Sequence, residues 1–112
     1  MRTERTDTLF KALADPTRRR MLDLLAGKGP LSVSQLAAAF PDLVASGISK
    51  HLMGLRAAGL VKADRDGRQQ IYRLNAKAVT STLQPWLSKY ERYADAALER
   101  LRQAAEEDDR HE

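Results

Sequence analysis

The chain places a lysine beside a histidine in the segment SGISKHLMGLRAAGLV, residues 46–61, where apolar residues recur at helical spacing. Such a pair can bind a metal, transfer protons, fill a core or contact a partner molecule. A metal site needs further ligands, but the only other histidine is His111, and no Asp or Glu stands one helical turn from His51. The chain also has no cysteine, which excludes thiolate sites and disulfides. We therefore predict no metal site.

The residue types needed for catalysis are missing as well. The chain has no cysteine nucleophile, no serine with a plausible histidine partner, no glycine-rich phosphate loop and no paired carboxylates in an apolar setting. We predict that the protein is not an enzyme, with no catalytic residues and no cofactor. Lys50 and His51 must then be explained by the helix that positions them.

The segment predicts a helix with one buried and one exposed face. Ile48, Leu52 and Leu55 lie within about 60° of one another around the helix and form the buried side. Ser46, Ser49 and Lys50 belong to the remaining surface, which is small and polar around one cation. Such a surface can approach the floor of a major groove, which is about 12 Å wide. No acidic residue occurs from 44 to 63, so we predict that this helix contacts double-stranded DNA.

Residues 60–74, LVKADRDGRQQIYRL, predict a β-hairpin. Two short, partly β-branched and aromatic runs flank Asp66-Gly67, which is a strong signal for a tight turn. Arginines on a thin ribbon suit a minor groove or flanking phosphates, so the predicted contacts there are Arg65, Arg68 and Gln69. The alternative is an ordinary exposed hairpin with solubilising charges.

Further positions are assigned to the predicted DNA surface. Ser34 and Gln35, in the helix that precedes the turn, belong to the predicted contact set. His51 belongs to it too, with two interpretations open: it is half-buried and bonded to backbone or a phosphate, or it contacts a base. The TRRR run, residues 17–20, is either a phosphate anchor at a helix start or pairs partly with neighbouring aspartates.

Capping residues mark the other helices. Asp15 and Pro16 predict the start of a second helix, and Gly27 predicts its left-handed C-cap. Ser32 and Gln35 have the spacing of a capping box for a third helix. The fourth helix leads with either Ala45 or Ser46.

A long helical region follows Asn75, its predicted cap, and Pro85 either kinks or restarts this region. Beyond Pro85 the apolar residues form a heptad stripe, which needs a partner helix. The partner can be a second copy of the chain. If the first and last helices share one interface, the predicted interface residues are Leu9, Phe10, Leu87, Tyr90, Ala94, Ala97 and Leu101. The alternative is that the stripe packs on the first helix of the same chain.

Length and charge agree with these assignments. The 112 residues, 43% of them apolar, suffice for one small domain. Residues 1–75 contain 13 Lys and Arg against 7 Asp and Glu, a net charge of +6, while residues 76–112 have a net charge of −2. A basic first part suggests a polyanionic partner. No apolar run approaches the roughly 18 residues of a membrane span, so we expect a soluble cytoplasmic protein without membrane contact.

Three helices, a turn, a fourth helix and a hairpin make the order of a winged helix-turn-helix. We predict a mainly α fold with a small β-hairpin, dimeric, in which residues 1–84 form the DNA-binding domain. Residues 85–105 form its dimerisation helix and residues 106–112 an acidic flexible tail. The recognition helix, about residues 45–58, would enter the major groove, with the wing, about residues 60–74, on the minor groove or the backbone.

The segments FKALADPTRRRMLDLL, LSVSQLAAAF, ISKHLMGLRAAGLV and DGRQQIYRL together resemble the ArsR-type winged-helix transcriptional repressors, over about residues 7–95. The resemblance implies a homodimer that binds an inverted-repeat operator and blocks transcription. It places Ser46, Ser49 and Lys50 at base- and phosphate-contacting positions and Arg68 on the wing. The last helix resembles a branch without metal-sensing ligands, so metal sensing is not implied and the inducer is unknown.

The main alternative is a winged helix that binds another protein instead of DNA. A protein-binding helix displays large apolar or aromatic anchors, whereas the exposed face here offers Met53 alone. DNA binding is therefore the preferred interpretation. If an inducer exists, Trp86, Tyr90 and Tyr93 are candidates to line its pocket, although an aromatic cluster at this spacing is more often core.

Overall fold

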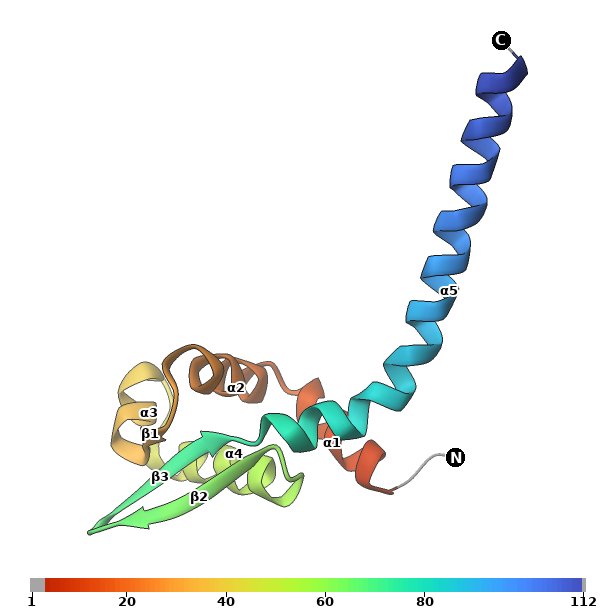
Figure 1. The fold of residues 1–112 in the computed structure, drawn as a ribbon. Coiled ribbons are helices and arrows are strands. Elements are labelled where there is room, and N and C mark those ends of the chain that lie inside the picture. Colours follow the sequence, from red (N-terminus) through yellow and green to blue (C-terminus); the bar gives the residue numbers. More distant parts are fainter. Residues whose placement is uncertain (1–3, 112) are drawn as a thin grey trace. The chain divides into compact units, whose positions relative to one another are not determined.

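The computed structural model describes residues 4–111 of the chain (Figure 1). The chain forms two compact units, unit 1 (Met1–Thr82) and unit 2 (Leu83–Glu112). The elements in chain order are α1 (Glu4–Ala14), α2 (Pro16–Lys28), β1 (Leu31–Ser32), α3 (Val33–Ala39), α4 (Ala45–Ala57), β2 (Val61–Asp66), β3 (Gln69–Leu74) and α5 (Ala76–His111).

The start of α2 is set by the predicted cap. The Asp15 carboxylate accepts hydrogen bonds from the N–H of Thr17 at 2.8 Å and of Arg18 at 3.2 Å, and Pro16 is the first helical residue. The end of α2 differs from the prediction. Gly27 lies inside the helix, and Gly29, with a φ of 84°, is the C-cap whose N–H donates to the carbonyl of Leu25. Both glycines could end the helix, but only the second has a positive φ, which glycine adopts without steric cost.

Side-chain caps also begin α3 and α5, as predicted. The Gln35 N–H donates to the Ser32 hydroxyl at 3.1 Å, and the Ser32 N–H donates to the Gln35 side-chain oxygen at 2.8 Å, which completes the capping box. The Asn75 side chain accepts from the Ala78 N–H and donates to the Gly59 carbonyl. This second bond ties the start of α5 to the end of α4.

The core of unit 1 draws on every helix from α1 to α4 and on the sheet. Its largest fully buried side chains are Leu9, Met21, Leu25, Leu36, Ile48, Leu52, Leu55 and Leu60. Burying a leucine or isoleucine side chain contributes roughly 1.5–3 kcal/mol. The predicted buried side of the fourth helix is thereby confirmed. The assignment of Leu9 to a dimer interface is wrong, because this side chain is 1% exposed and packs within its own chain.

The sheet has three antiparallel strands in the order β1-β3-β2. The hairpin of β2 and β3 is confirmed, and Asp66 pairs with Gln69, so the two central turn residues are Gly67 and Arg68. Gly67 has a φ of 63°, the conformation that such a turn requires at its first central position. The strand β1 was not predicted. It consists of two residues that pair with the distant Tyr72 and Ile71, and no local pattern announces such a pairing.

The helix α5 runs without a break from Ala76 to His111 and includes Pro85. A fresh start at Pro85 is therefore wrong; the proline removes one backbone hydrogen bond, to the carbonyl of the exposed Ser81, where water can replace it.

The tail predicted to be flexible is helical through His111. Arg102 forms ion pairs with Glu99 and Glu106, one turn away on either side, and such pairs support a helix of good helix formers. Among residues 4–111, no helix is long and apolar enough to cross a membrane.

Candidate nucleic-acid interface

The helix α4 presents a polar face to solvent, opposite its buried leucines. Ser46, Ser49 and Lys50 are all exposed, as predicted, and Met53 is 69% exposed. The helix itself contributes no carboxylate, since the acidic residues nearest to it along the sequence are Asp42 and Asp64, both outside its bounds. The side chains of the exposed face are short apart from those of Lys50, Met53 and the exposed Arg56 at the border. This face can therefore approach a polyanion closely without like-charge repulsion.

The helix α4 begins at Ala45 without a side-chain cap. Its N-cap residue is Val44, which makes no capping hydrogen bond and is 70% exposed. First-turn N–H groups without a side-chain partner, together with the positive end of the helix dipole, favour an anion at this end. Sequence reasoning left the start of the helix open, and only the absence of a capping residue at position 44 could have indicated this feature.

His51 lies at the border of the exposed face and is half-buried, with 19% of its side chain exposed. Its Nδ1 atom accepts a 3.3 Å hydrogen bond from Nε of Arg18, in the first turn of α2. The expected half-burial is observed, but the hydrogen-bond partner is a side chain and not the backbone, and contact of His51 with DNA stays a prediction. With Nδ1 as acceptor, a neutral imidazole places its proton on Nε2.

Asp15 completes this cluster. Its Oδ2 lies 3.9 Å from Nδ1 of His51, while Oδ1 caps α2. Burial disfavours the charged carboxylate, but the backbone hydrogen bonds from Arg18 and Thr17, together with the charge of the imidazolium that His51 becomes when it is protonated and the charge of Arg18, outweigh burial and lower the pKa of Asp15. The carboxylate stays ionised at neutral pH and serves as the cap of α2.

Gly54 makes room for the Arg18 guanidinium. A methyl group built at the Cα of Gly54 would lie 2.6 Å from Cζ and from one Nη of Arg18, and 2.8 Å from the other Nη. The guanidinium therefore lies directly against the backbone of α4, one turn beyond Lys50. Sequence reasoning missed this contact, because the residues that form it are distant in the chain.

The other arginines of the TRRR run are also engaged within the chain. Arg19 donates to the carbonyl of Leu13, and the Arg20 guanidinium lies 5.1 Å from the centre of the Phe40 ring. The N-terminus of α2 is already capped by Asp15. A phosphate anchor at this helix start is therefore not supported. Neither Arg19 nor Arg20 pairs with an aspartate among the described residues.

The wing extends from the sheet with exposed residues from 64 to 70 (Figure 1). Arg73 pairs with Asp64 across the two strands at 3.2 Å, and both side chains are about half exposed. Arg65, Arg68 and Gln69 are exposed, and no ion pair joins either arginine to the residues that the structure describes. Their charges are available to a partner.

The two predicted contact residues in α3 differ in how far their side chains are already hydrogen-bonded within the chain. Ser34 is exposed. Gln35 is exposed too, but its side-chain oxygen accepts the hydrogen bond that completes the capping box. The amide N–H groups of Gln35 and the second lone pair of its side-chain oxygen remain for an outside partner.

Unit 2 presents an apolar stripe along α5. Leu87, Tyr90 and Leu101 of the predicted interface are 39%, 56% and 68% exposed. Ala94 is exposed and Ala97 half-buried, and Trp86, Tyr93 and Leu98 widen the same stripe. The rings of Trp86 and Tyr90 are in contact, with centroids 4.9 Å apart. An apolar surface of this kind on a helix requires a covering partner.

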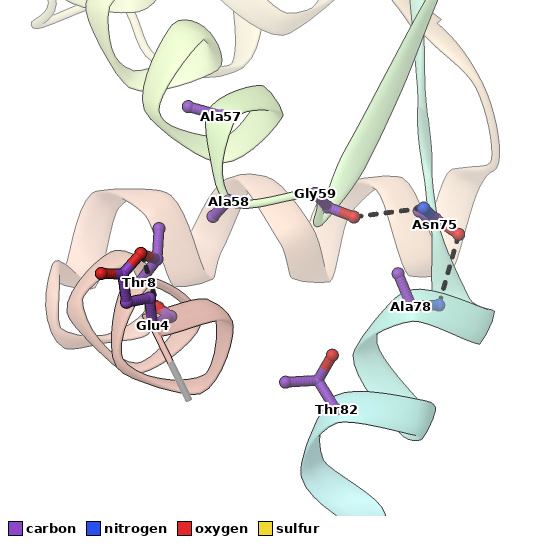
Figure 2. Close-up of a pocket in the computed structure, with 8 residues that line it drawn as sticks. All are labelled: Glu4, Thr8, Ala57, Ala58, Gly59, Asn75, Ala78 and Thr82. Atoms are coloured by element: carbon purple, nitrogen blue, oxygen red, sulfur yellow. Dashed lines mark hydrogen bonds between the residues drawn. The ribbon is translucent and has the colours of Figure 1, made fainter. Parts of the chain in front are cut away.

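A pocket of about 490 Å³ lies within unit 1, between α1, the end of α4 and the start of α5 (Figure 2). Asn75 stands on its wall, with both ends of its amide bonded within the chain. Glu4 provides the carboxylate among the lining residues, which are Glu4, Thr8, Ala57, Ala58, Gly59, Asn75, Ala78 and Thr82. The pocket adjoins the end of α4 opposite to its uncapped start.

Comparison with known proteins identifies the family. A helix-turn-helix domain family matches residues 13–63. The chain is 40% identical over 90 residues to the arsenic resistance transcriptional regulator ArsR1 of Pseudomonas putida, which covers 71% of the chain and 70% of that protein. The chain belongs to the ArsR family of transcriptional regulators. The predicted resemblance is thereby confirmed.

Two further comparisons agree with this assignment. The chain is 33% identical over 84 residues to the transcriptional repressor SdpR of Bacillus subtilis, covering 75% of the chain and 90% of SdpR. It is also similar to a homodimeric winged helix-turn-helix DNA-binding domain from Mycobacterium bovis, described as a possible ArsR-family regulator. That similarity has a TM-score of 0.63 and 30% identity, and it covers 79% of this chain and 81% of the other. The predicted winged helix-turn-helix fold is confirmed.

The Pseudomonas protein is named for arsenic resistance. We do not assign a response to arsenic to this ArsR-family regulator. The chain contains no cysteine. Among the residues that the structure describes, no group of three His, Cys, Asp or Glu side chains could bind a metal ion.

Proposed function

We propose that this ArsR-family regulator is a homodimeric, sequence-specific DNA-binding repressor that acts in the cytoplasm and has no catalytic activity. Each copy inserts α4 into the major groove and lays its wing on the adjacent minor groove or backbone. Ser46, Ser49 and Lys50 make the central contacts, with Arg65, Arg68 and Gln69 on the wing. Ser34 and the side-chain amide of Gln35 contact the sugar-phosphate backbone of the DNA beside the groove that α4 enters.

The observation that supports this proposal most strongly is the exposed face of α4. Short polar side chains surround Lys50 there, and no carboxylate interrupts the face. The uncapped N-terminus of the same helix favours a phosphate, and the exposed Val44 and Met53 offer apolar contacts to thymine methyl groups. A protein-binding helix would expose larger anchors.

The dimer is proposed to form through the apolar stripe of α5 and the half-buried Phe10 of α1. A two-fold dimer presents two α4 helices, so the preferred DNA site should be an inverted repeat with half-sites about one helical turn apart. Occupation of such a site at a promoter blocks transcription. No metal or cofactor is required for DNA binding in this proposal, and the inducer is left open.

Selection of duplexes from a random-sequence pool tests the proposal directly. The purified protein should enrich one inverted repeat after several rounds, and a reporter gene placed behind that repeat should be silenced when the protein is produced. Failure to enrich any sequence, or enrichment of an isolated half-site alone, would contradict the proposed mode of binding. Increased reporter expression would contradict repression alone.

A further inference from the structure

We propose that Arg18 is a positioning residue for the recognition helix, acting through Nδ1 of His51 and the open surface of Gly54. This inference rests on the proposed DNA-binding function, since it assigns a role to residues next to the proposed contact face. In this assignment His51, which the sequence places among DNA-contacting residues, acts through its buried side and not on a base.

The contact between α2 and α4 is specific in geometry. The Arg18 Nε donates to Nδ1 of His51 at 3.3 Å, and its guanidinium occupies the space where a side chain at Gly54 would begin. His51 and Gly54 are three residues apart and thus neighbours on one side of α4. One side chain therefore meets α4 at two points and fixes its rotation about its own axis relative to α2.

The fixed rotation matters because of what lies beside it. Gly54 is one turn from Lys50, so a rotation of α4 that shifted Gly54 would also move Lys50 across the proposed DNA surface. Asp15 holds Arg18 at the start of α2. It caps the backbone N–H of Arg18 and lies 3.9 Å from His51. Recognition of bases depends on the geometry of the contacts more strongly than attraction to phosphates does. Loss of the contact between Arg18 and α4 should therefore reduce sequence discrimination before it reduces overall affinity.

The Gly54→Ala variant separates this role from charge and from folding. Alanine is a better helix former than glycine, and no charge changes. The added methyl group meets only the mobile end of Arg18 among its nearest atoms, so the guanidinium is displaced without disturbing the core. The positioning role predicts at least about a tenfold fall in the ratio of specific to non-specific affinity, with thermal stability unchanged or higher. Arg18→Ala should lower the ratio similarly.

Two substitutions of His51 distinguish its two nitrogen atoms. Asparagine can present an acceptor near the position of Nδ1, whereas glutamine reaches the position of Nε2. The proposal predicts that His51→Asn retains discrimination within about threefold and that His51→Gln loses it. Lys28→Ala removes a cation from the exposed end of α2, the helix that also contains Arg18. This variant serves as the control and should retain discrimination.

The measurement is the affinity of each variant for the duplex that the wild-type protein enriches and for a scrambled duplex of equal length. The proposal is overturned if Gly54→Ala and Arg18→Ala both discriminate as the wild type does. It is equally overturned if His51→Gln binds normally while His51→Asn does not, because His51 would then act on DNA through Nε2. If the wild-type protein itself showed no discrimination, the proposed function would fail first, and that outcome is distinct from the other two.

Discussion

Arg18 and His51 lie 33 residues apart in the chain, yet Nε of the arginine donates a hydrogen bond to Nδ1 of the histidine. The bond joins the first turn of α2 to the middle of α4, the helix whose exposed face is the proposed DNA-contacting surface. Asp15 caps the first of these helices and approaches the histidine. The orientation of the proposed contact face thus depends on residues that do not belong to that face.

Asp15→Ala should destabilise the folded protein by about 1 kcal/mol at neutral pH, the usual effect of losing an N-cap. The lowered pKa of Asp15 sets the pH dependence. Its stabilisation is complete above the pKa of the unfolded chain, about 3.9, and disappears as the pH falls through the lower pKa of the folded state. Urea unfolding of both proteins at several pH values measures this. Asp15→Asn retains a capping oxygen and is the control; a difference that persisted into strongly acidic solution would contradict the prediction.

Arg68→Ala should weaken binding to every duplex to a similar extent, because an exposed wing arginine contacts phosphates and not a particular base. Because the proposed dimer lays two wings on the DNA, the slope of log affinity against log salt concentration should fall by about 2, close to 1 for each copy. Arg73→Ala removes the same charge from the same hairpin, but Arg73 is paired with Asp64 in the structure. That variant should leave the slope close to the wild-type value. An unchanged slope in Arg68→Ala would show that the wing does not contact the backbone.

The local signals of the sequence were sufficient for the starts of α2, α3 and α5 and for the hairpin. Asp15 with Pro16, and Ser32 with Gln35, act through partners within three residues, so their spacing alone predicts the caps. Periodicity placed Ile48, Leu52 and Leu55 on the buried side of α4, because a helix has a fixed angular repeat.

The features that sequence analysis missed depend on distant residues or on competing local signals. The strand β1 exists only through its pairing with β3. The packing of the Arg18 guanidinium against Gly54 likewise forms only when α2 and α4 come together. Gly27 and Gly29 are both plausible helix ends, and the sequence does not choose between them. The burial of Leu9 could not be read from its helix, since a single apolar stripe can face the core or a second copy.

Leu101→Glu should convert the protein from dimer to monomer. The side chain is 68% exposed on the apolar stripe of α5, and a carboxylate within an apolar interface carries a large desolvation cost. Sedimentation equilibrium at micromolar concentration measures the effect. Gln103→Glu introduces the same charge on the polar side of α5 and should leave the dimer intact. If Leu101→Glu sedimented as the wild type does, the proposed interface would be wrong.

Zinc and arsenite at micromolar concentration should leave the protein bound to DNA. The chain has no thiolate ligand to offer, and His51 is engaged with Arg18. A competition titration monitored by fluorescence anisotropy tests this, with chelator-treated protein as the reference. Release of DNA by either ion at that concentration would show a binding site that the proposed function does not include.

The most direct test of DNA recognition by α4 is a salt-dependent titration with DNA from immediately upstream of the protein's own gene, or with the selected inverted repeat. Unrelated DNA provides the comparison, Lys50→Ala removes the central cation, and Lys28→Ala controls for charge. We predict that the wild-type protein prefers the specific duplex by about a thousandfold, that salt weakens this binding steeply, and that Lys50→Ala loses the preference while Lys28→Ala retains it. Equal and weak binding of the wild type to every duplex, the selected repeat included, would contradict the account.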